Sequence, residues 1–169
     1  PTICHHYTIS PIPFDVSLAG VIQGIVLTGL EIEGFTPLPL RLINVCLPTG
    51  VKHHQRRAHA LKHLARMPAG PHTILGGDFN FVENTHDTTN YSPYHHLKHG
   101  AQKHWNDLLS KLGLWEVEQD VHTNYSGDAR TSRIDRFYIT HSEADCALYT
   151  PTSHAVPYTH LTPPTIYSE

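Results

Sequence analysis

The sequence has few cysteines, a single methionine and no long apolar run. Its three cysteines, Cys4, Cys46 and Cys146, are scattered, and no C-x-x-C pair occurs. This usage suits a reducing compartment better than a disulfide framework. No apolar stretch is long enough to cross a bilayer, and the first residues show no basic segment followed by an apolar core. We therefore expect an intracellular protein, nuclear or cytoplasmic, without a membrane partner.

An overall basic character is also lacking. Twelve lysines and arginines face 15 aspartates and glutamates, which gives a net charge of −3 at pH 7. The global charge therefore does not point to nucleic acid. The ordinary pKa of a histidine side chain is about 6.5. With 16 histidines in the chain, any attraction to a polyanion should therefore strengthen as the pH falls.

Length and composition suit one globular domain. Hydrophobic residues make up 39% of 169 residues, which is enough for a single core, and we expect residues 1–169 to form one domain. The chain does not begin with methionine, so we interpret it as a processed product or a fragment.

Strand-like and helical patterns alternate along the chain, which predicts a mixed α/β layered fold. The near-continuous apolar run 40–47 is typical of a strand buried on both faces. We expect residues 1–14, the polar stretch 81–98 and the tail from 151 to be irregular. Further strands are predicted within 16–32, 72–75, 133–140 and 144–150, and helices within 51–67 and 98–112.

The stretch from Thr73 to Asn80 is the centre of the pattern. A short apolar run ends at Gly76 and Gly77, and Asp78 and Asn80 follow two residues apart. Residues two apart on a strand share a face, and open α/β sheets place their chemistry at the carboxyl ends of strands. A tight turn with a polar tip explains these residues equally well.

A second carboxylate, Asp135, lies on a predicted strand face that it shares with Phe137 and Ile139. Burying it is costly unless it has a partner. The partner could be Arg133 or Arg136 in a salt bridge. Alternatively, Asp135 could orient a histidine such as His160.

These groups together suit phosphodiester cleavage. Asp78 could activate water, Asn80 could donate hydrogen bonds to a developing negative charge, and His160 could complete the site. By contrast, His59 and His63 lie four apart on a predicted helix without an accompanying carboxylate. A solvated helix face is favoured over a metal site there.

Several motifs resemble the endonuclease/exonuclease/phosphatase superfamily, and most of all the endonuclease domains of LINE-type retroelements. They are Leu42–Pro48, which is like the family's N-x-Y-x-P strand, Gly76–Asn80 followed by Asp87, and Thr123-x-Tyr125. The most specific is the run S-R-I-D-R-F-Y at 132–138. The order G-D-F-N and then S-R-I-D-R carries most of the resemblance.

The resemblance implies a DNase I-like fold of two packed mixed sheets flanked by helices, of which this chain is the C-terminal part. It also implies magnesium-dependent hydrolysis of nucleic acid, DNA rather than RNA. In this reading Asp78 positions or deprotonates the attacking water and Asn80 contacts the scissile phosphate. Asp135 pairs with the catalytic His160, and Asn44 and Thr123 contact the substrate.

The sequence also departs from the family pattern. The family's metal-binding glutamate lies upstream of anything present, and Glu31 and Glu33 are in the wrong place to replace it. Thr159 stands where the family has the aspartate of its Ser-Asp-His motif, and Cys46 replaces a tyrosine. Magnesium prefers carboxylate and water oxygens, so no metal site is intact.

We therefore expect a truncated or degenerate endonuclease with weak activity, whose missing first strands would leave a sheet edge open. The alternatives are a pseudo-enzyme that binds nucleic acid or phosphate, a phosphatase of the same superfamily, and a domain in which the Asp and His residues are all structural.

Overall fold

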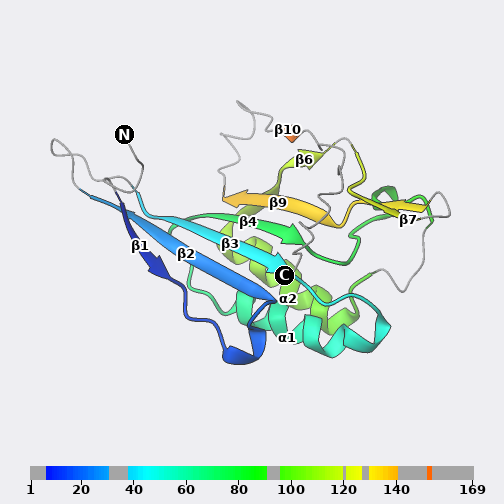
Figure 1. Ribbon diagram of the computed structural model, residues 1–169, viewed down its shortest axis with the longest axis horizontal. Helices are drawn as coiled ribbons and strands as arrows, with labels where there is room; N and C mark the ends of the chain where they lie inside the picture. The colour runs from blue at the N-terminus through cyan, green and yellow to red at the C-terminus, as the bar shows by residue number, and fades with distance from the viewer. Residues whose placement is uncertain are drawn as a thin grey trace, which may run out of the picture.

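The computed structural model describes residues 7–30, 38–90, 96–119, 121–126, 130–140 and 152–153. Within them, a six-stranded mixed sheet forms the centre of the molecule (Figure 1). Strands β3 and β4 are parallel, and the other neighbours in the sheet are antiparallel. In spatial order the strands are β1 (Tyr7–Pro11), β2 (Ile22–Gly29), β3 (Leu40–Cys46), β4 (His72–Asp78), β9 (Asp135–Thr140) and β5 (Leu114–Glu116).

Two small two-stranded sheets lie beyond this centre. Strand β6 (Glu118–Gln119) pairs in parallel with β10 (Thr152–Ser153). Strands β7 (Asn124–Ser126) and β8 (Arg130–Ser132) form a hairpin. The α/β layered architecture predicted from the sequence is confirmed.

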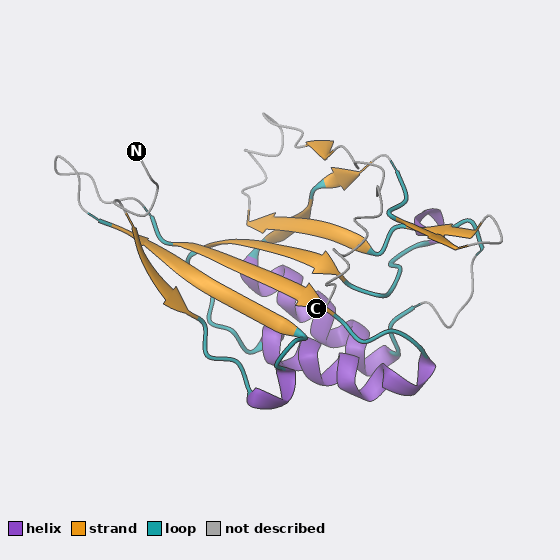
Figure 2. Cartoon of the chain, in the orientation of Figure 1, coloured by secondary structure: helices purple, strands orange, loops and turns teal. Residues whose placement is uncertain are grey.

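Both α-helices, α1 (His54–Ala65) and α2 (His99–Leu112), cover one side of the large sheet (Figure 2). Three short 3₁₀ turns complete the description: η2 (Val16–Leu18), η3 (Val51–His53) and η4 (Thr85–Asp87). Neither helix in the described ranges has the length and the apolar composition that crossing a membrane requires.

Helix α2 forms as its sequence predicts. Ala101, Trp105, Leu108 and Leu112 are buried, which places one apolar stripe against the sheet. Gly113 ends the helix with a left-handed φ of 59°, and its N–H bonds back to the carbonyls of the last turn.

The core fills the space between the helices and the covered sheet face. Val45 and Leu75 of the sheet are at most 1% exposed, and Leu61 and Leu64 of α1 are fully buried against them. The prediction that the strand within 40–47 is buried on both faces is wrong, because Asn44 and Cys46 are exposed. Helices cover only one face of this sheet, so the side chains of β3 alternate between buried and open.

Two further sequence expectations need correction. Residues 7–11 form strand β1 rather than irregular structure, because they pair with the far end of β2. The polar stretch 81–98 contains η4, which is closed by a capping box between Asn84 and Asp87. The strand expected at 144–150 lies outside the described residues.

Gly77 allows β3 and β4 to come together at the end of the sheet. A Cβ atom at Gly77 would lie 2.0 Å from the carbonyl oxygen of Val45, and its φ is +130°. We expect Gly77→Ala to destabilise the protein by about 3 kcal/mol or more, because the new methyl group would force the strands apart.

The matched control for this change is Gly100→Ala in α2. A Cβ atom at Gly100 meets nothing within 4 Å. The Gly100→Ala variant should be more stable than the unchanged protein by about 0.5 kcal/mol, because alanine has the higher helix propensity. Chemical denaturation checks both values, and equal stabilities of the two variants would contradict the close approach at Gly77.

Candidate functional site

Two carboxylates meet at one end of the large sheet. Asp78 is the last residue of β4, and it is directly opposite Asp135, the first residue of β9. On its other side Asp78 is in register with Cys46, the last residue of β3. All three lie on the sheet face that the helices leave uncovered, since their covered neighbours Val45 and Arg136 are buried. The fold therefore brings together two of the residues singled out in the sequence.

Asn80 is held against Asp78 by a turn rather than by strand alternation. The strand ends at Asp78, and Asn80 adopts a φ of 51°. Its backbone N–H donates to Asp78 Oδ1 at 2.9 Å, and its side-chain Nδ2 donates to Asp78 Oδ2 at 2.8 Å. Nδ2 also donates to the carbonyl of Leu47 at 2.8 Å. Both amide hydrogens of Asn80 are thus engaged, and a contact with a phosphate would have to replace one of these bonds.

The loop after β3 completes the support of Asp78. The Leu47 N–H donates to the carbonyl of Asp78 at 2.8 Å. The next carbonyl, of Pro48, accepts from Arg57 Nη2 at 2.7 Å and from Arg57 Nε at 3.1 Å. Arg57 extends from α1 and is only 2% exposed. A buried cation on the helix layer therefore fixes the loop that holds both Asn80 and Asp78.

The pKa of Asp78 is raised above its ordinary value. Burial of the carboxylate is the main cause, and the negative charge of Asp135 adds to it. The hydrogen bonds from Asn80 and the charge of Arg57 oppose the shift without cancelling it. Such a carboxylate holds a proton more readily than an isolated aspartate, as a general base does.

The other two expected substrate contacts lie on either side of this pair. Thr123 Oγ1 accepts hydrogen bonds from the N–H of Asp135 at 3.1 Å and of Ile134 at 3.3 Å, so it caps the start of β9. Because both bonds use the oxygen as acceptor, the hydroxyl proton can still be donated. Asn44 is exposed on β3 and borders an open hollow of about 340 Å³ along the uncovered sheet face, with Gly76 and Phe137 on its other side.

Comparisons with models of protein families and with curated protein sequences find no match. Solved structures do match. The catalytic domain of APE2 from Xenopus laevis is 17% identical with a TM-score of 0.50, over 72% of this chain and 46% of that one. An AP endonuclease from Archaeoglobus fulgidus is 18% identical with a TM-score of 0.47, over 68% and 52%. The endonuclease domain of TRAS1, a telomere-specific non-LTR retrotransposon, is 18% identical with a TM-score of 0.48, over 82% and 58%.

The chain has the DNase I-like fold. The resemblance noted in the sequence is thereby confirmed at the level of the fold. The chain spans about half the length of these solved structures, so activity and substrate have to be argued from its own residues.

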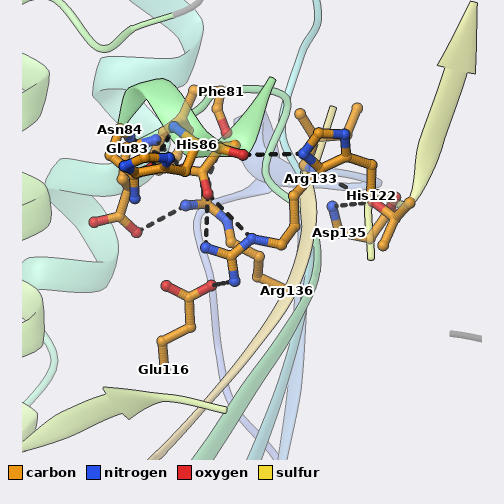
Figure 3. Close-up of polar contacts among 12 residues, drawn as sticks. Phe81, Glu83, Asn84, His86, Glu116, His122, Arg133, Asp135 and Arg136 are labelled. Atoms are coloured by element: carbon orange, nitrogen blue, oxygen red, sulfur yellow. Dashed lines mark hydrogen bonds and ion pairs between the residues drawn. The ribbon is translucent and has the colours of Figure 1, made fainter. Parts of the chain in front are cut away.

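In this DNase I-like fold the two arginines of the S-R-I-D-R motif do not pair with Asp135. Arg133 donates to Asp87 Oδ1 through Nη2 at 2.6 Å, and it also pairs with Glu116 (Figure 3). Arg136 pairs with Glu83 instead, at 2.8 Å. The interpretation of Asp135 as a salt-bridge partner of these arginines is therefore wrong. Alternation along β9 explains this for Arg136, which points to the covered face while Asp135 points to the uncovered one. Arg133 precedes the strand and is taken up by Asp87 and Glu116.

Arg136 is a structural residue that sequence reasoning missed. It is fully buried, and its guanidinium carbon lies 4.7 Å from the ring centre of Phe81 and 5.3 Å from that of Phe79. Its Nη2 donates to the carbonyl of Phe81, and Tyr138 donates to the same Glu83 oxygen that Arg136 contacts. The sequence showed only that a charged residue shares a strand face with an aromatic residue. This pattern does not identify the carboxylate with which Arg136 pairs.

Asp87, part of the resemblance, is also structural. Burial works to raise its pKa, but the bonds from Arg133 and from the N–H groups of Asn84 and Glu83 outweigh it, so the pKa lies below its usual range. Arg133 and Asp87 thus anchor η4 to the start of β9.

The described residues do not form a complete magnesium site. Within the described ranges, no three His, Cys, Asp or Glu side chains come together as a metal site would require. The pair Asp78 and Asp135 supplies two carboxylates, and no third such side chain joins them among the described residues. Magnesium is commonly held by one or two carboxylates together with water and substrate phosphate, so this pair is a partial set of ligands rather than a complete site. His160 and Thr159, like Glu31 and Glu33, lie outside the described residues.

The ion pair of Arg136 gives a stability prediction. We expect Arg136→Met to destabilise the fold by about 3 kcal/mol, because it leaves the partly buried Glu83 and the Phe81 carbonyl without their donor. Arg56→Met, at an exposed position of α1, should change stability by less than about 0.5 kcal/mol. Urea denaturation compares the two, and a small effect at Arg136 would show that Glu83 finds another partner at no cost.

The carboxylate pair gives a pH prediction. Because the folded-state pKa of Asp78 is raised, its contribution to stability is present at low pH and is lost as the pH rises through that pKa. Asp135→Asn removes the neighbouring charge, so the pKa of Asp78 should fall. Carboxyl-carbon NMR titration measures it. Asp107→Asn, an exposed change on α2, should leave it unaltered, and an unchanged pKa in Asp135→Asn would show that the two carboxylates do not interact.

Proposed function

We propose that this chain is the C-terminal part of a DNase I-like domain that hydrolyses phosphodiester bonds of nucleic acid, DNA rather than RNA. We further propose that it is only weakly active by itself. The observation that carries the proposal is the carboxylate pair of Asp78 and Asp135 at the sheet end, with the raised pKa of Asp78. The order of the G-D-F-N and S-R-I-D-R motifs supports a nuclease of the LINE-type retroelement class over a phosphatase.

In this proposal Asp78 is the base. Its half-buried carboxylate lies on the uncovered sheet face, and its raised pKa brings its proton affinity nearer to neutral pH. Water hydrogen-bonded to Asp78 would lose a proton to it as the water oxygen attacks phosphorus. The P–O bond to one sugar oxygen would break in the same reaction, and that leaving oxygen would take up a proton from solvent. Asn80 fixes the direction of the Asp78 carboxylate through two hydrogen bonds. Asn80 is thus a positioning residue in the free protein, and it becomes a phosphate contact if the amide exchanges its bond to Leu47.

The remaining groups have roles on either side of the phosphate. The hydroxyl of Thr123 can donate to a phosphate oxygen while it caps β9. The resemblance assigns Asp135 to orient His160, which would stabilise the phosphate. It also assigns magnesium, which would neutralise phosphate charge in an intact relative. Because the described residues supply only two carboxylates toward that ion, no step here depends on it, and we expect low activity.

A second candidate is a phosphate-binding pseudo-enzyme. Two observations favour it: both amide hydrogens of Asn80 are engaged, and the described residues hold no cluster of three metal ligands. This candidate predicts binding of nucleic acid with strong salt dependence and without strand cleavage.

Nicking of supercoiled plasmid distinguishes the two candidates. We expect slow nicking by residues 1–169 in the presence of magnesium, and a loss of at least about 100-fold in Asp78→Ala, because the base is removed. Asp107→Ala changes an exposed aspartate on α2 and should nick like the unchanged protein. Binding without nicking, or nicking that survives in Asp78→Ala, would reject the hydrolytic proposal.

A further inference from the structure

The outward face of α1 carries a row of basic side chains. Lys52, Arg56, His59, Lys62 and Arg66 are all exposed, and we call them the α1 stripe. They are spaced three or four residues apart, so they lie on one face of η3, α1 and the following turn. The row is about 21 Å long at a rise of about 1.5 Å per residue.

Basic residues are concentrated in this part of the chain. Residues 51–72 contain five lysines and arginines, five histidines and no aspartate or glutamate. The remaining 147 residues hold seven lysines and arginines against 15 acidic residues. A protein with a net charge of −3 therefore presents a local surface of the opposite sign. Arg57 has a separate explanation, since it is buried beneath the loop that follows β3.

The stability of the helix does not account for the α1 stripe as a whole, although Lys62 in the last turn is favourably placed. Lys52 and Arg56, and likewise Lys62 and Arg66, are four residues apart, and like charges at this spacing destabilise a helix by about 0.2–0.5 kcal/mol per pair. The first turn of α1 has no acidic residue, and its N-cap residue His53 makes no side-chain capping bond. Among the described residues, no carboxylate pairs with any of the four lysines and arginines of the stripe.

One carboxylate faces the row from a neighbouring element. Asp15 caps η2 through the N–H of Ser17, and the Ser17 hydroxyl lies 3.3 Å from His59 Nε2. The bonds with Ser17 lower the pKa of Asp15, and the nearby rings of His63 and His59 assist. The partner of the stripe must therefore supply its own negative charges.

We propose that the α1 stripe binds the phosphate backbone of nucleic acid at a surface separate from the candidate catalytic site. One strand of B-DNA carries a phosphate about every 3.4 Å, so about six phosphates span the length of the stripe. A membrane surface fits less well, because helices that bind bilayers insert an apolar face. The apolar side chains of α1 are instead buried against the sheet, among them Ala60, Leu61 and Leu64. The proposal goes beyond hydrolysis and holds whether or not the chain cleaves.

Binding of a fluorescent duplex of about 20 base pairs at several salt concentrations tests the proposal. The variant Arg56→Gln/Lys62→Gln removes two stripe charges. Its affinity should fall at least tenfold, and the slope of log K against log salt should become shallower by about 2, at about 0.9 per lost phosphate contact. Thermal unfolding shows whether the variant is folded. It should be, because exposed like charges are removed.

The matched control is Lys98→Gln/Lys103→Gln, which makes the same change in net charge at two exposed positions, the N-cap of α2 and its second turn. Its affinity should stay within about twofold of the unchanged protein. Asp15→Asn keeps the cap of η2 but removes the facing negative charge, so it should bind more tightly. An unchanged affinity in the stripe variant, or an equal loss in both double variants, would overturn the proposal.

Two further arms separate this proposal from its alternatives. Stripe-dependent binding to vesicles with about 20% phosphatidylserine, without stripe-dependent binding to DNA, would reject nucleic acid in favour of a membrane. Asp78→Ala should bind the duplex at least as tightly as the unchanged protein, because it removes a negative charge, and this would support a docking surface distinct from the catalytic site. Loss of binding in Asp78→Ala would contradict that separation.

Discussion

The buried ion pair of Arg136 and Glu83 is the interaction on which the candidate site depends. Arg136 is on β9 next to Asp135, and Glu83 follows Asn80 by three residues. The pair therefore ties the segment that leaves the site to the strand that supplies the second carboxylate. The rings of Phe79, Phe81 and Tyr138 surround the guanidinium and exclude water from it. In such a setting an unpaired charge is costly, so the two segments hold one relative position.

The two faces of the sheet consequently have different roles. The covered face holds the core, Arg136 and Arg57, whose contacts fix the backbone on either side of Asp78. The uncovered face presents the carboxylates and Asn44 to solvent. Gly76 and Gly77 suit this division, because a side chain at Gly77 would meet β3 and one at Gly76 would meet the ring of Phe137. The covered face of these strands thus makes the site rigid, and the uncovered face leaves the site accessible.

Local patterns predicted the elements well, and distant partners were where prediction failed. The apolar stripe and the terminal glycine of α2 predicted that helix. The order of the motifs predicted that Asp78 and Asp135 belong to one site, and they are opposite each other in the sheet. No local pattern in the sequence shows that Arg133 pairs with Asp87, 46 residues earlier, rather than with the nearby Asp135. The engagement of both Asn80 hydrogens likewise depends on Leu47, 33 residues away. Strand 40–47 was misjudged because its composition does not reveal that helices cover only one face.

Electrostatics connects the candidate site with the helix layer. Asp78 and Asp135 place two carboxylates together, so the site repels a polyanion unless a cation intervenes. The described residues do not assemble a magnesium site that would reverse this sign. The α1 stripe can supply attraction to nucleic acid, because it holds four of the 12 lysines and arginines of the chain. A surface of this kind would hold nucleic acid against the protein by counterion release while the carboxylates act locally. Binding of nucleic acid and cleavage of its phosphodiester bonds would then be separable properties. The helix layer would carry the first, and the uncovered face of the sheet would carry the second.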